Sequence, residues 1–282
     1  MNGQLIDTGP SPRGWHRLES ALRCPQLYAW GYGQRGSEDH FPPAAPLVRG
    51  TLGHVALAHL YARLQCVQEG RDPREYLPAH EAIQRVAERF GELGAGQLPI
   101  VARAVRAYLE RYAADTPRYR VLGVERLLET DFLGYRYTAR VDLEFEDAAG
   151  RVWLTDHKFV AKIEGKAFRR YIMSGQFLGL AHLGSREWGS RFGGVLLNLV
   201  GCGDPVGFAR EPIDPAPWML ARFPEIVVQA EERIAELEAR IADGLPAPAS
   251  PSEFTCWTPY GPCPAFEACR WGVPPREAAR HA

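Results

Sequence analysis

The stretch that decides the fold is RVDLEFEDAAGRVWLTDHKF, residues 140–159. Two runs rich in apolar and β-branched residues flank the turn sequence Asp147-Ala-Ala-Gly150, a pattern that predicts two paired strands. Asp142 lies within the first strand and Asp156 near the end of the second, so pairing through this turn would bring both carboxylates to one end of a sheet. Neighbouring carboxylates repel each other unless a cation lies between them, and oxygen ligands suit Mg²⁺ or Mn²⁺. The stretch therefore predicts a metal site.

Lys158 follows Asp156 by two residues, and side chains alternate along a strand, so both are expected on one face. Its ammonium could position an attacking water or neutralise charge that develops on a phosphate. An isolated Asp-x-Lys is more often an exposed ion pair, which contributes little. That simpler interpretation leaves Asp142 unexplained.

The segments around this stretch predict a mixed α/β core with a helical annex before it. Residues 15–33 carry an amphipathic pattern broken at Cys24-Pro25, and apolar residues recur at helical spacing over 47–68. Further elements are predicted in this order: helices over 73–93 and 99–114, strands over 119–129, 130–146 and 151–159 as a meander, a helix over about 167–188, strands over 194–200 and 205–210, and a helix over 218–242.

Composition narrows the class of protein. The chain has 282 residues and a formal net charge of −1, whereas a protein that grips long duplex by phosphate contacts alone is usually more basic. A small cleft that handles one strand end needs only local positive charge. The first residues contain no apolar run typical of a signal peptide, and residues 194–200 are too few to span a bilayer, so we expect a cytoplasmic protein without a membrane partner.

His54 ends the sequence Gly50-Thr-Leu-Gly-His54 within the helix predicted over 47–68. A lone helical histidine is more often structural than a ligand. Two glycines so close together cost helix stability, which suggests that another part of the chain approaches the backbone here.

These pieces together resemble the RecB-like branch of the PD-(D/E)XK nuclease superfamily. In that branch a G-x-x-x-H helix precedes a G-x-(V/I)-D strand, a strand with (D/E)-x-K, and a helix with Q-x-x-x-Y. Here Ala139 and Arg140 precede Val141, so the glycine of the first strand motif is absent. The matching residues are Gly50–His54, Val141-Asp142, Asp156-His157-Lys158 and Gln176. Leu180 occupies the position of the motif's tyrosine.

The resemblance implies a restriction-endonuclease-like mixed sheet flanked by helices, an N-terminal helical annex and a C-terminal cysteine segment. It implies a divalent Mg²⁺ or Mn²⁺ ion held by His54, Asp142, Asp156 and the backbone carbonyl of His157. Lys158 would orient the nucleophilic water, and Gln176 would support the site or contact the substrate. The expected activity is that of a metal-dependent DNA nuclease, an exonuclease or end-processing enzyme on single-stranded or frayed DNA that hydrolyses phosphodiesters with metal-activated water.

Four of the six cysteines are candidates for a second metal site. Cys256, Cys263 and Cys269 are spaced C-x₆-C-x₅-C in a proline-rich tail, and Cys24 lies far before them. Four cysteines can complete one Zn²⁺ or [4Fe–4S] site. One cysteine before the nuclease core and three after it resembles the iron–sulfur subgroup, which includes CRISPR adaptation nucleases and helicase-associated nuclease domains. That resemblance implies a [4Fe–4S] cluster, with Zn²⁺ as the alternative. Cys66 and Cys202 are assigned to packing.

The domain organisation expected is one nuclease domain over residues 1–282. Its parts are a helical part over 15–115 with the histidine motif, a catalytic core over 116–242, and a cysteine tail over 243–282 joined to Cys24. The basic residues between the active strand and the next helix are candidate DNA contacts, although charge runs are as often plain solvated surface: Lys162, Lys166, Arg169 and Arg170.

Two other functions stay open at this stage. One is a non-catalytic DNA-binding or assembly module that retains the nuclease fold, and the other is an iron–sulfur redox protein. No phosphate-binding loop of the Gly-x₄-Gly-Lys-Ser/Thr type is present, so an unwinding motor would have to be a separate helicase, or the partner a recombination or adaptation protein.

Overall fold

The computed structural model describes residues 3–33, 41, 43–113, 118–165, 168–258, 261–273 and 275–278. The chain divides into two compact units. The first comprises residues 1–11, 43–129 and 138–221, and the second comprises residues 12–42, 130–137 and 222–282. Within the described residues, no helix is both long enough and apolar enough to cross a membrane.

The helices are α1 Trp15–Arg23, α2 Pro25–Tyr28, α3 Ala45–Gln68, α4 Ala79–Glu88, α5 Gly91–Arg111, α6 Arg169–Ile172, α7 Gly175–Trp188, α8 Pro217–Ala242, α9 Glu253–Cys256, α10 Phe266–Trp271 and α11 Pro275–Ala278. Short turns of other helix types are η1 Ala29–Gly33, η3 Pro73–Glu75 and η5 Gly189–Arg191. The strands are β1 Arg120–Phe132, β2 Tyr135–Glu146, β3 Val152–Val160, β4 Phe192–Gly201, β5 Gly207–Ile213, β6 Trp257–Thr258 and β7 Gly261–Pro262.

Five strands form one mixed sheet in the order β1-β2-β3-β4-β5. β3 runs antiparallel to β2 and parallel to β4, and β4 runs antiparallel to β5. The parallel pair requires a crossover, which α7 supplies. The α/β class with a mixed sheet flanked by helices, predicted from the sequence, is confirmed, as is the meander of the first three strands.

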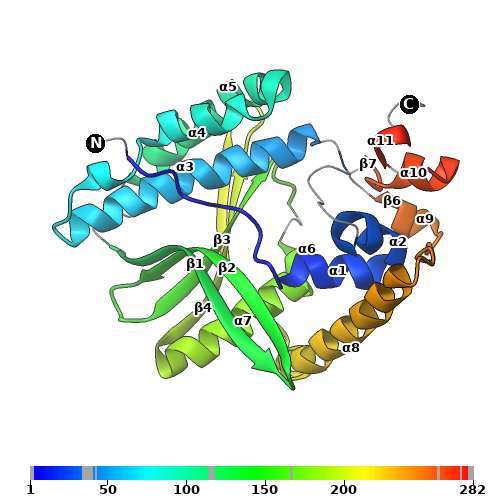
Figure 1. Cartoon of the computed structure of the whole chain (residues 1–282). Coiled ribbons are helices and arrows are strands. Elements are labelled where there is room, and N and C mark those ends of the chain that lie inside the picture. The colour runs from blue at the N-terminus through cyan, green and yellow to red at the C-terminus, as the bar shows by residue number, and fades with distance from the viewer. Residues whose placement is uncertain are drawn as a thin grey trace. The chain divides into compact units, whose positions relative to one another are not determined.

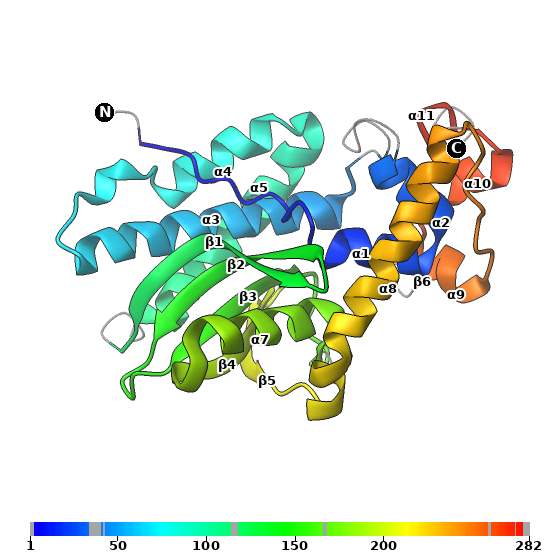
Figure 2. The ribbon, with the colours of Figure 1, turned by 60° about the horizontal axis from the view of Figure 1, so that its bottom comes forward.

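Helices cover this sheet on both faces in the first unit (Figures 1 and 2). α3 packs on β3 and carries α4 and α5 on its other side, while α7 packs on β3 and β4 from the opposite face. Since α3 lies between the sheet and two helices, it is apolar around most of its circumference. The core beneath it includes Val48, Leu52, Val55, Ile83, Val101, Val105, Tyr108, Phe159 and Val200.

The turn between β2 and β3 is organised by one carboxylate. Asp147 Oδ1 accepts hydrogen bonds from the backbone N–H groups of Ala149 and Arg151, and its Oδ2 accepts from Trp153 Nε1 at 3.0 Å. An aspartate at the start of a turn satisfies backbone donors that the turn leaves unpaired. This local chemistry fixes the register, which pairs Glu146 with Val152.

Several predicted boundaries were wrong. The helix predicted over 73–93 begins at Ala79, because Pro73–Glu75 forms a separate turn capped by Asp72. The division between the first two strands lies at Leu133-Gly134, where Gly134 has a φ of 92°, and not at residue 129. The helix predicted over about 167–188 is two helices that part at Met173 and Ser174, with residue 167 outside the described range. The break predicted at Cys24-Pro25 is confirmed.

The helix predicted over 99–114 begins eight residues earlier, at Gly91, and runs through Pro99. A proline inside a helix removes one backbone hydrogen bond and normally ends the helix before it. Here Leu93, Leu98 and Ile100 pack against the core beneath α3, so the apolar contacts on both sides of the proline hold the segment helical.

Gly53 marks the closest approach of α3 to the sheet. A Cβ atom built on Gly53 would overlap the ring of Phe159 on β3, whereas one built on Gly50 would meet nothing within 4 Å. The approach that the two glycines suggested is therefore real at Gly53 alone. It places the next residue, His54, directly over the sheet.

We expect Gly53→Ala to lower the free energy of unfolding by about 1–3 kcal/mol, because the new methyl group forces Phe159 or the helix to move. The matched variant Gly50→Ala has open space around it and should be neutral or stabilise by up to about 1 kcal/mol, since alanine favours helix over glycine. Urea unfolding of both variants provides the measurement. Equal effects of the two substitutions would contradict the close contact.

Candidate active site

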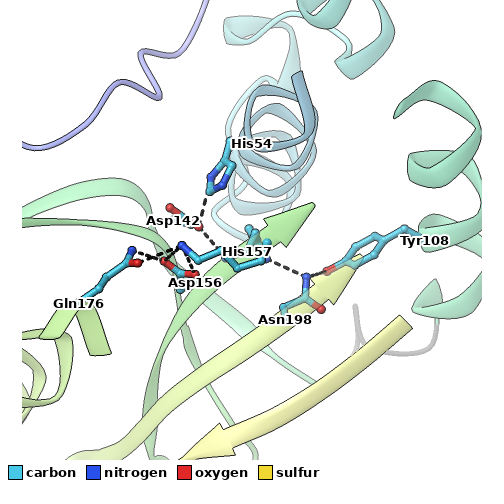
Figure 3. Close-up of polar contacts among 8 residues, drawn as sticks. His54, Tyr108, Asp142, Asp156, His157, Gln176 and Asn198 are labelled. Carbon is cyan, nitrogen blue, oxygen red and sulfur yellow. Dashed lines mark hydrogen bonds and ion pairs between the residues drawn. The ribbon is translucent and has the colours of Figure 1, made fainter. Parts of the chain in front are cut away.

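The candidate site begins where the ladder between β2 and β3 stops. Pairing of the two strands ends with Leu143 and Thr155. Beyond that pair, the backbone N–H of His157 donates to Asp142 Oδ2 at 2.7 Å (Figure 3). The carboxylate thus replaces the backbone carbonyl that would accept this hydrogen bond in a continuous ladder. Asp142 is thereby fixed next to the peptide of His157.

His54 reaches the same carboxylate from α3. Its Nδ1 lies 3.3 Å from Asp142 Oδ2. Burial in the site opposes the imidazolium, but the charge of Asp142 and the hydrogen bond to it outweigh that effect and raise the pKa of His54. For Asp142 burial alone would raise the pKa, and the charge and hydrogen bond of His54 lower it well below the usual range. Both shifts favour the charged forms of the two residues, which stabilise each other across this contact.

Asp156, Lys158 and Gln176 form a second group of contacts on the face toward α7. Lys158 Nζ lies 3.1 Å from Asp156 Oδ1, 2.9 Å from Asp156 Oδ2 and 3.0 Å from Gln176 Oε1. Gln176 Nε2 donates to Asp156 Oδ1 at 2.6 Å (Figure 3). Burial opposes the ammonium, yet Asp156 and Asp142 raise the pKa of Lys158, so it stays charged at neutral pH.

The imidazole of His157 lies on the opposite face of β3 from Asp156 and Lys158. Its ring stacks on Tyr61 of α3, with centroids 5.9 Å apart, and Asn198 Nδ2 lies 2.8 Å from its Nδ1 (Figure 3). Burial lowers the pKa of His157 to about 3, so the ring is neutral at physiological pH.

A third carboxyl group, that of Glu125 on β1, joins the site and was missed by the sequence interpretation. Glu125 is buried and has a φ of 51°, a left-handed conformation that is uncommon and strained for a non-glycine residue. Along β1 the buried positions are 121, 123 and 125, and then 128, 130 and 132. The alternation shifts by one residue after Glu125, as at a β-bulge, so Glu125 faces inward with residues 121 and 123 while Glu129 is exposed.

The donor atoms fit a divalent cation. One atom each from His54, Glu125 and Asp142 lies within 4.8 Å of the others, and among the described residues this is the one such group of three. Imidazole nitrogen and carboxylate oxygen are ligands that Mn²⁺ accepts, and Mg²⁺ accepts the carboxylates. Asp156 does not belong to the group; its Oδ2 is buried and receives no hydrogen bond of good geometry from a described residue, although Lys158 Nζ is 2.9 Å away.

The electrostatics of Glu125 give a second argument for a cation. Burial and the neighbouring charge of Asp142 raise the pKa of Glu125 to about 10. A buried carboxyl group placed beside another carboxylate is destabilising when it ionises, unless positive charge is added. The residues present therefore fit a divalent ion better than they fit an empty, fully ionised site.

Comparison with known proteins places this geometry in a family. The model of the PD-(D/E)XK nuclease superfamily matches residues 15–270. The chain belongs to this superfamily. None of the curated proteins compared with it matches.

Two solved structures are similar to the chain. One is a candidate exonuclease from Eubacterium rectale, with 11% identity over 86% of this chain and 85% of that chain and a TM-score of 0.45. The other is SSO0001, with 17% identity over 55% of this chain and 70% of that chain and a TM-score of 0.33.

The structure describes most of the other residues that the sequence singled out. Leu180, at the position of the motif's tyrosine, is 1% exposed and packs in the core, so it offers no polar group to the site. Of the candidate DNA contacts, Lys162 and Arg169 are exposed, Arg170 stacks on Tyr171, and Lys166 lies outside the described residues.

In the second unit, the four candidate cysteines line one cavity of about 300 Å³. Cys24 and Cys263 are buried, Cys256 is half-buried and Cys269 is exposed. The backbone N–H of Ser250 donates to Cys24 Sγ at 3.4 Å. No three of these sulfur atoms lie within 4.8 Å of one another in the part of the chain that is described. Cys66 and Cys202 are buried apart from this cavity, at 0% and 3% exposure.

Glu125→Gln tests whether the third carboxyl group belongs to the site. The folded pKa lies far above the ordinary value of 4.5, so between these values the folded chain retains a proton that the unfolded chain releases, and stability falls as pH rises. Glutamine does not ionise, so the variant does not lose stability in this way as the pH rises. Without metal, the variant should therefore be more stable than wild type by a margin that grows from about pH 6 to about pH 8.5.

Added Mn²⁺ should reverse this order, because a ligand stabilises the folded state more when it binds more tightly, and the variant lacks one carboxylate ligand. Thermal unfolding in EDTA and in Mn²⁺ measures both effects. Glu110→Gln on the exposed side of α5 serves as the control and should change neither. A variant that matches wild type in both conditions would remove Glu125 from the site.

Proposed function

We propose that this protein is a metal-dependent DNA nuclease that acts as an exonuclease or end-processing enzyme on single-stranded or frayed DNA. Its membership in the PD-(D/E)XK superfamily supports phosphodiester hydrolysis as the reaction. The observation that carries the proposal is the joining of His54, Asp142, Asp156, Lys158 and Gln176 around the end of the β2–β3 ladder. These residues come from separate segments of the chain, and packing alone does not explain why their polar groups meet here.

The roles proposed for these side chains follow from their contacts. His54, Asp142 and Glu125 would hold a divalent ion, with Asp156 and the carbonyl of His157 adjoining it. Bound there, the ion would supply the Lewis acidity that polarises a phosphate and makes a water molecule more acidic. Lys158, which Asp156 and Gln176 hold in position, would stabilise negative charge on the phosphate as it is attacked. Gln176 would orient Lys158 and Asp156 relative to each other.

The choice of DNA ends as substrate rests on the family resemblance and on charge. A chain with a net charge of −1 has little general attraction for long duplex. The exposed Lys162 and Arg169 follow the active strand and would contact the strand that enters the site. Unwinding would require a separate helicase, or the strand end would come from a recombination or adaptation protein, since the sequence has no phosphate-binding loop.

Lys158→Ala should lower the rate of DNA cleavage by about 10²–10³-fold, because removal of one group that stabilises transition-state charge has an effect of this size. The assay uses end-labelled single-stranded and duplex DNA with Mg²⁺ or Mn²⁺, and the ladder of products reports the direction of cleavage. Arg85→Ala, an exposed residue of α4, is the control for a lost positive charge and should cleave as wild type does.

The same assay separates the alternatives. Absence of cleavage by folded wild-type protein that binds Mn²⁺ would favour a non-catalytic DNA-binding module. Cleavage that survives in Lys158→Ala would show that the activity belongs to another site or to a contaminant.

We further propose that Cys24, Cys256, Cys263 and Cys269 hold a [4Fe–4S] cluster. Their common cavity and the N–H donor to Cys24 Sγ support a site for thiolates, since such donors stabilise cluster sulfur. A single Zn²⁺ with bonds of 2.3 Å would bring sulfurs to about 3.8 Å from one another. The resemblance to the iron–sulfur subgroup favours the larger group, with one Zn²⁺ as the alternative. The cluster would tie the C-terminal tail to the segment around Cys24 within a single nuclease domain over residues 1–282.

Protein purified without oxygen should carry about four iron and four sulfide per chain and show the broad visible absorbance of a cluster. Cys269→Ser should lose most of the iron, because a four-cysteine site needs every ligand. Cys66→Ser, in the core of α3, is the matched control and should keep its iron. If the wild-type protein carries one zinc per chain and no sulfide, the site binds Zn²⁺ and the cluster proposal is wrong.

A further inference from the structure

A row of polar side chains crosses the sheet directly behind the candidate active site. His157 on β3, Asn198 on β4 and Arg210 on β5 are register neighbours, and Asn198 is fully buried. Asn198 Nδ2 lies 2.8 Å from His157 Nδ1 (Figure 3), and Arg210 Nε donates to Asn198 Oδ1 at 2.9 Å. The row therefore joins three neighbouring strands through side chains as well as through the backbone.

The two helices over this face of the sheet extend the row. Arg210 Nη2 donates to the hydroxyl groups of Tyr61 on α3 and Tyr108 on α5, at 3.3 Å and 2.5 Å. The two hydroxyl groups lie 2.7 Å apart. Tyr61 also stacks on the ring of His157 at an interplanar angle of 9°. The ring of His157 is thus held from two directions, by the ring of Tyr61 and by the amide of Asn198.

Arg210 determines the direction of the hydrogen bonds in this row. A guanidinium can only donate, so the side-chain oxygen of Asn198 faces Arg210 and its amide nitrogen faces His157. The amide donates to Nδ1, and the proton of the neutral imidazole then resides on Nε2. Burial lowers the pKa of His157 to about 3, which agrees with a neutral ring. An apolar side chain in place of Asn198 would remove both contacts.

Close packing alone does not hold the ring of His157. A mostly apolar cavity of about 170 Å³ adjoins the ring on the α3 face, and its lining includes Leu64, Phe145 and Arg210. A cavity offers few contact atoms on its side of a ring, so dispersion contacts restrain the ring less there. The position of the ring therefore depends on directional contacts, among them the hydrogen bond from Asn198.

The backbone of the same residue belongs to the candidate active site. The N–H of His157 donates to Asp142 Oδ2 at 2.7 Å. The side chains before and after it, those of Asp156 and Lys158, meet on the opposite face of β3. Pairing of β3 with β2 has already ended at Thr155. A rotation of the strand about its axis at this point would move the ring on one face and the charged pair on the other together.

We propose that Asn198 is a positioning residue for the candidate active site, which it serves by fixing the orientation of His157. Through the peptide of His157, it sets where Asp142 lies relative to the pair of Asp156 and Lys158. This role rests on the proposed function, because it is a role toward the metal ion and the reaction. The contacts that create it belong to the protein alone and can be measured without metal.

Three variants test the role. Asn198→Leu keeps the branched shape of the side chain and removes both hydrogen bonds. Asn198→Asp keeps the acceptor for Arg210 and can accept from Nδ1–H of the other neutral tautomer of His157, so it retains both contacts. Leu196→Ala, two residues earlier on the same face of β4, is the control, because it removes apolar packing and no side-chain hydrogen bond.

The first readout is exchange of the His157 backbone N–H in the metal-free full-length protein, followed by NMR. Asn198→Leu should speed this exchange about tenfold or more relative to amides elsewhere in the sheet, because the hydrogen bond to Asp142 weakens. Asn198→Asp should stay within about threefold of wild type. Leu196→Ala should affect the amides of the sheet alike. Nitrogen-15 NMR should place the ring proton on Nε2 in wild type and on Nδ1 in Asn198→Asp.

The second readout is Mn²⁺ affinity together with the kinetics of DNA cleavage, at a temperature where every variant is folded. Asn198→Leu should weaken Mn²⁺ binding and lower kcat by about tenfold each, since loss of a group that orients ligands has effects of this size. The KM for DNA should stay within about twofold, because the variant leaves the strand contacts in place. Leu196→Ala should lose stability and keep the wild-type affinity and kcat.

Wild-type exchange at His157 in Asn198→Leu would overturn the proposal, as would equal losses of Mn²⁺ affinity in Asn198→Leu and Leu196→Ala. A ring proton on Nδ1 in the wild-type protein would also contradict it. If Asn198→Leu does not fold, His157→Phe takes its place, because it keeps a ring on Tyr61 and removes the hydrogen bond from Asn198. Wild-type protein that neither binds Mn²⁺ nor cleaves DNA would refute the proposed function, and the exchange readout would then decide the positioning role by itself.

Discussion

Three buried carboxyl groups on three neighbouring strands form the constraint on which the rest of the first unit depends. Glu125, Asp142 and Asp156 reach this region from β1, β2 and β3, and each is buried. Their mutual repulsion must be balanced within the fold, because water cannot screen it there. The chain provides His54 for Asp142 and Lys158 for Asp156. Glu125 forms no ion pair with the described residues, and burial together with the charge of Asp142 raises its pKa although the charge of Arg140 lowers it.

Because side chains alternate along a β-strand, the two faces of β3 carry different groups. Leu154, Asp156 and Lys158 face α7, while Thr155, His157 and Phe159 face α3. One strand thus carries the charged groups of the candidate active site on one side and the wall of an apolar cavity on the other. The peptide of His157 connects the two sides, since its N–H binds Asp142 and its ring lines the cavity. A change on either face can reach the other through a single residue.

The sequence was enough to predict the sheet around residues 140–159 and the convergence of Asp142 with the Asp156 segment, because turn chemistry and strand alternation are local. It predicted the histidine and lysine positions through the spacing of their motifs. It did not predict Glu125, because nothing local distinguishes this glutamate from Glu129 four residues later. The difference arises from the positive φ at residue 125, which shifts the alternation of β1 and is imposed by tertiary structure. The helix through Pro99 was missed for a similar reason, since its apolar contacts override a local stop signal.

Two residues that lower the stability of their own helix or strand both lie at the candidate site. Gly53 is an unfavourable residue inside a helix, and Glu125 is an unfavourable residue in a left-handed conformation. The first lets α3 approach Phe159 closely enough for His54 to meet Asp142, and the second turns a carboxyl group of the neighbouring strand into the same space. A fold selected for stability alone would retain neither. Both costs fall on residues that supply or position donor atoms of the candidate site, which agrees with the proposal that these groups hold one ion.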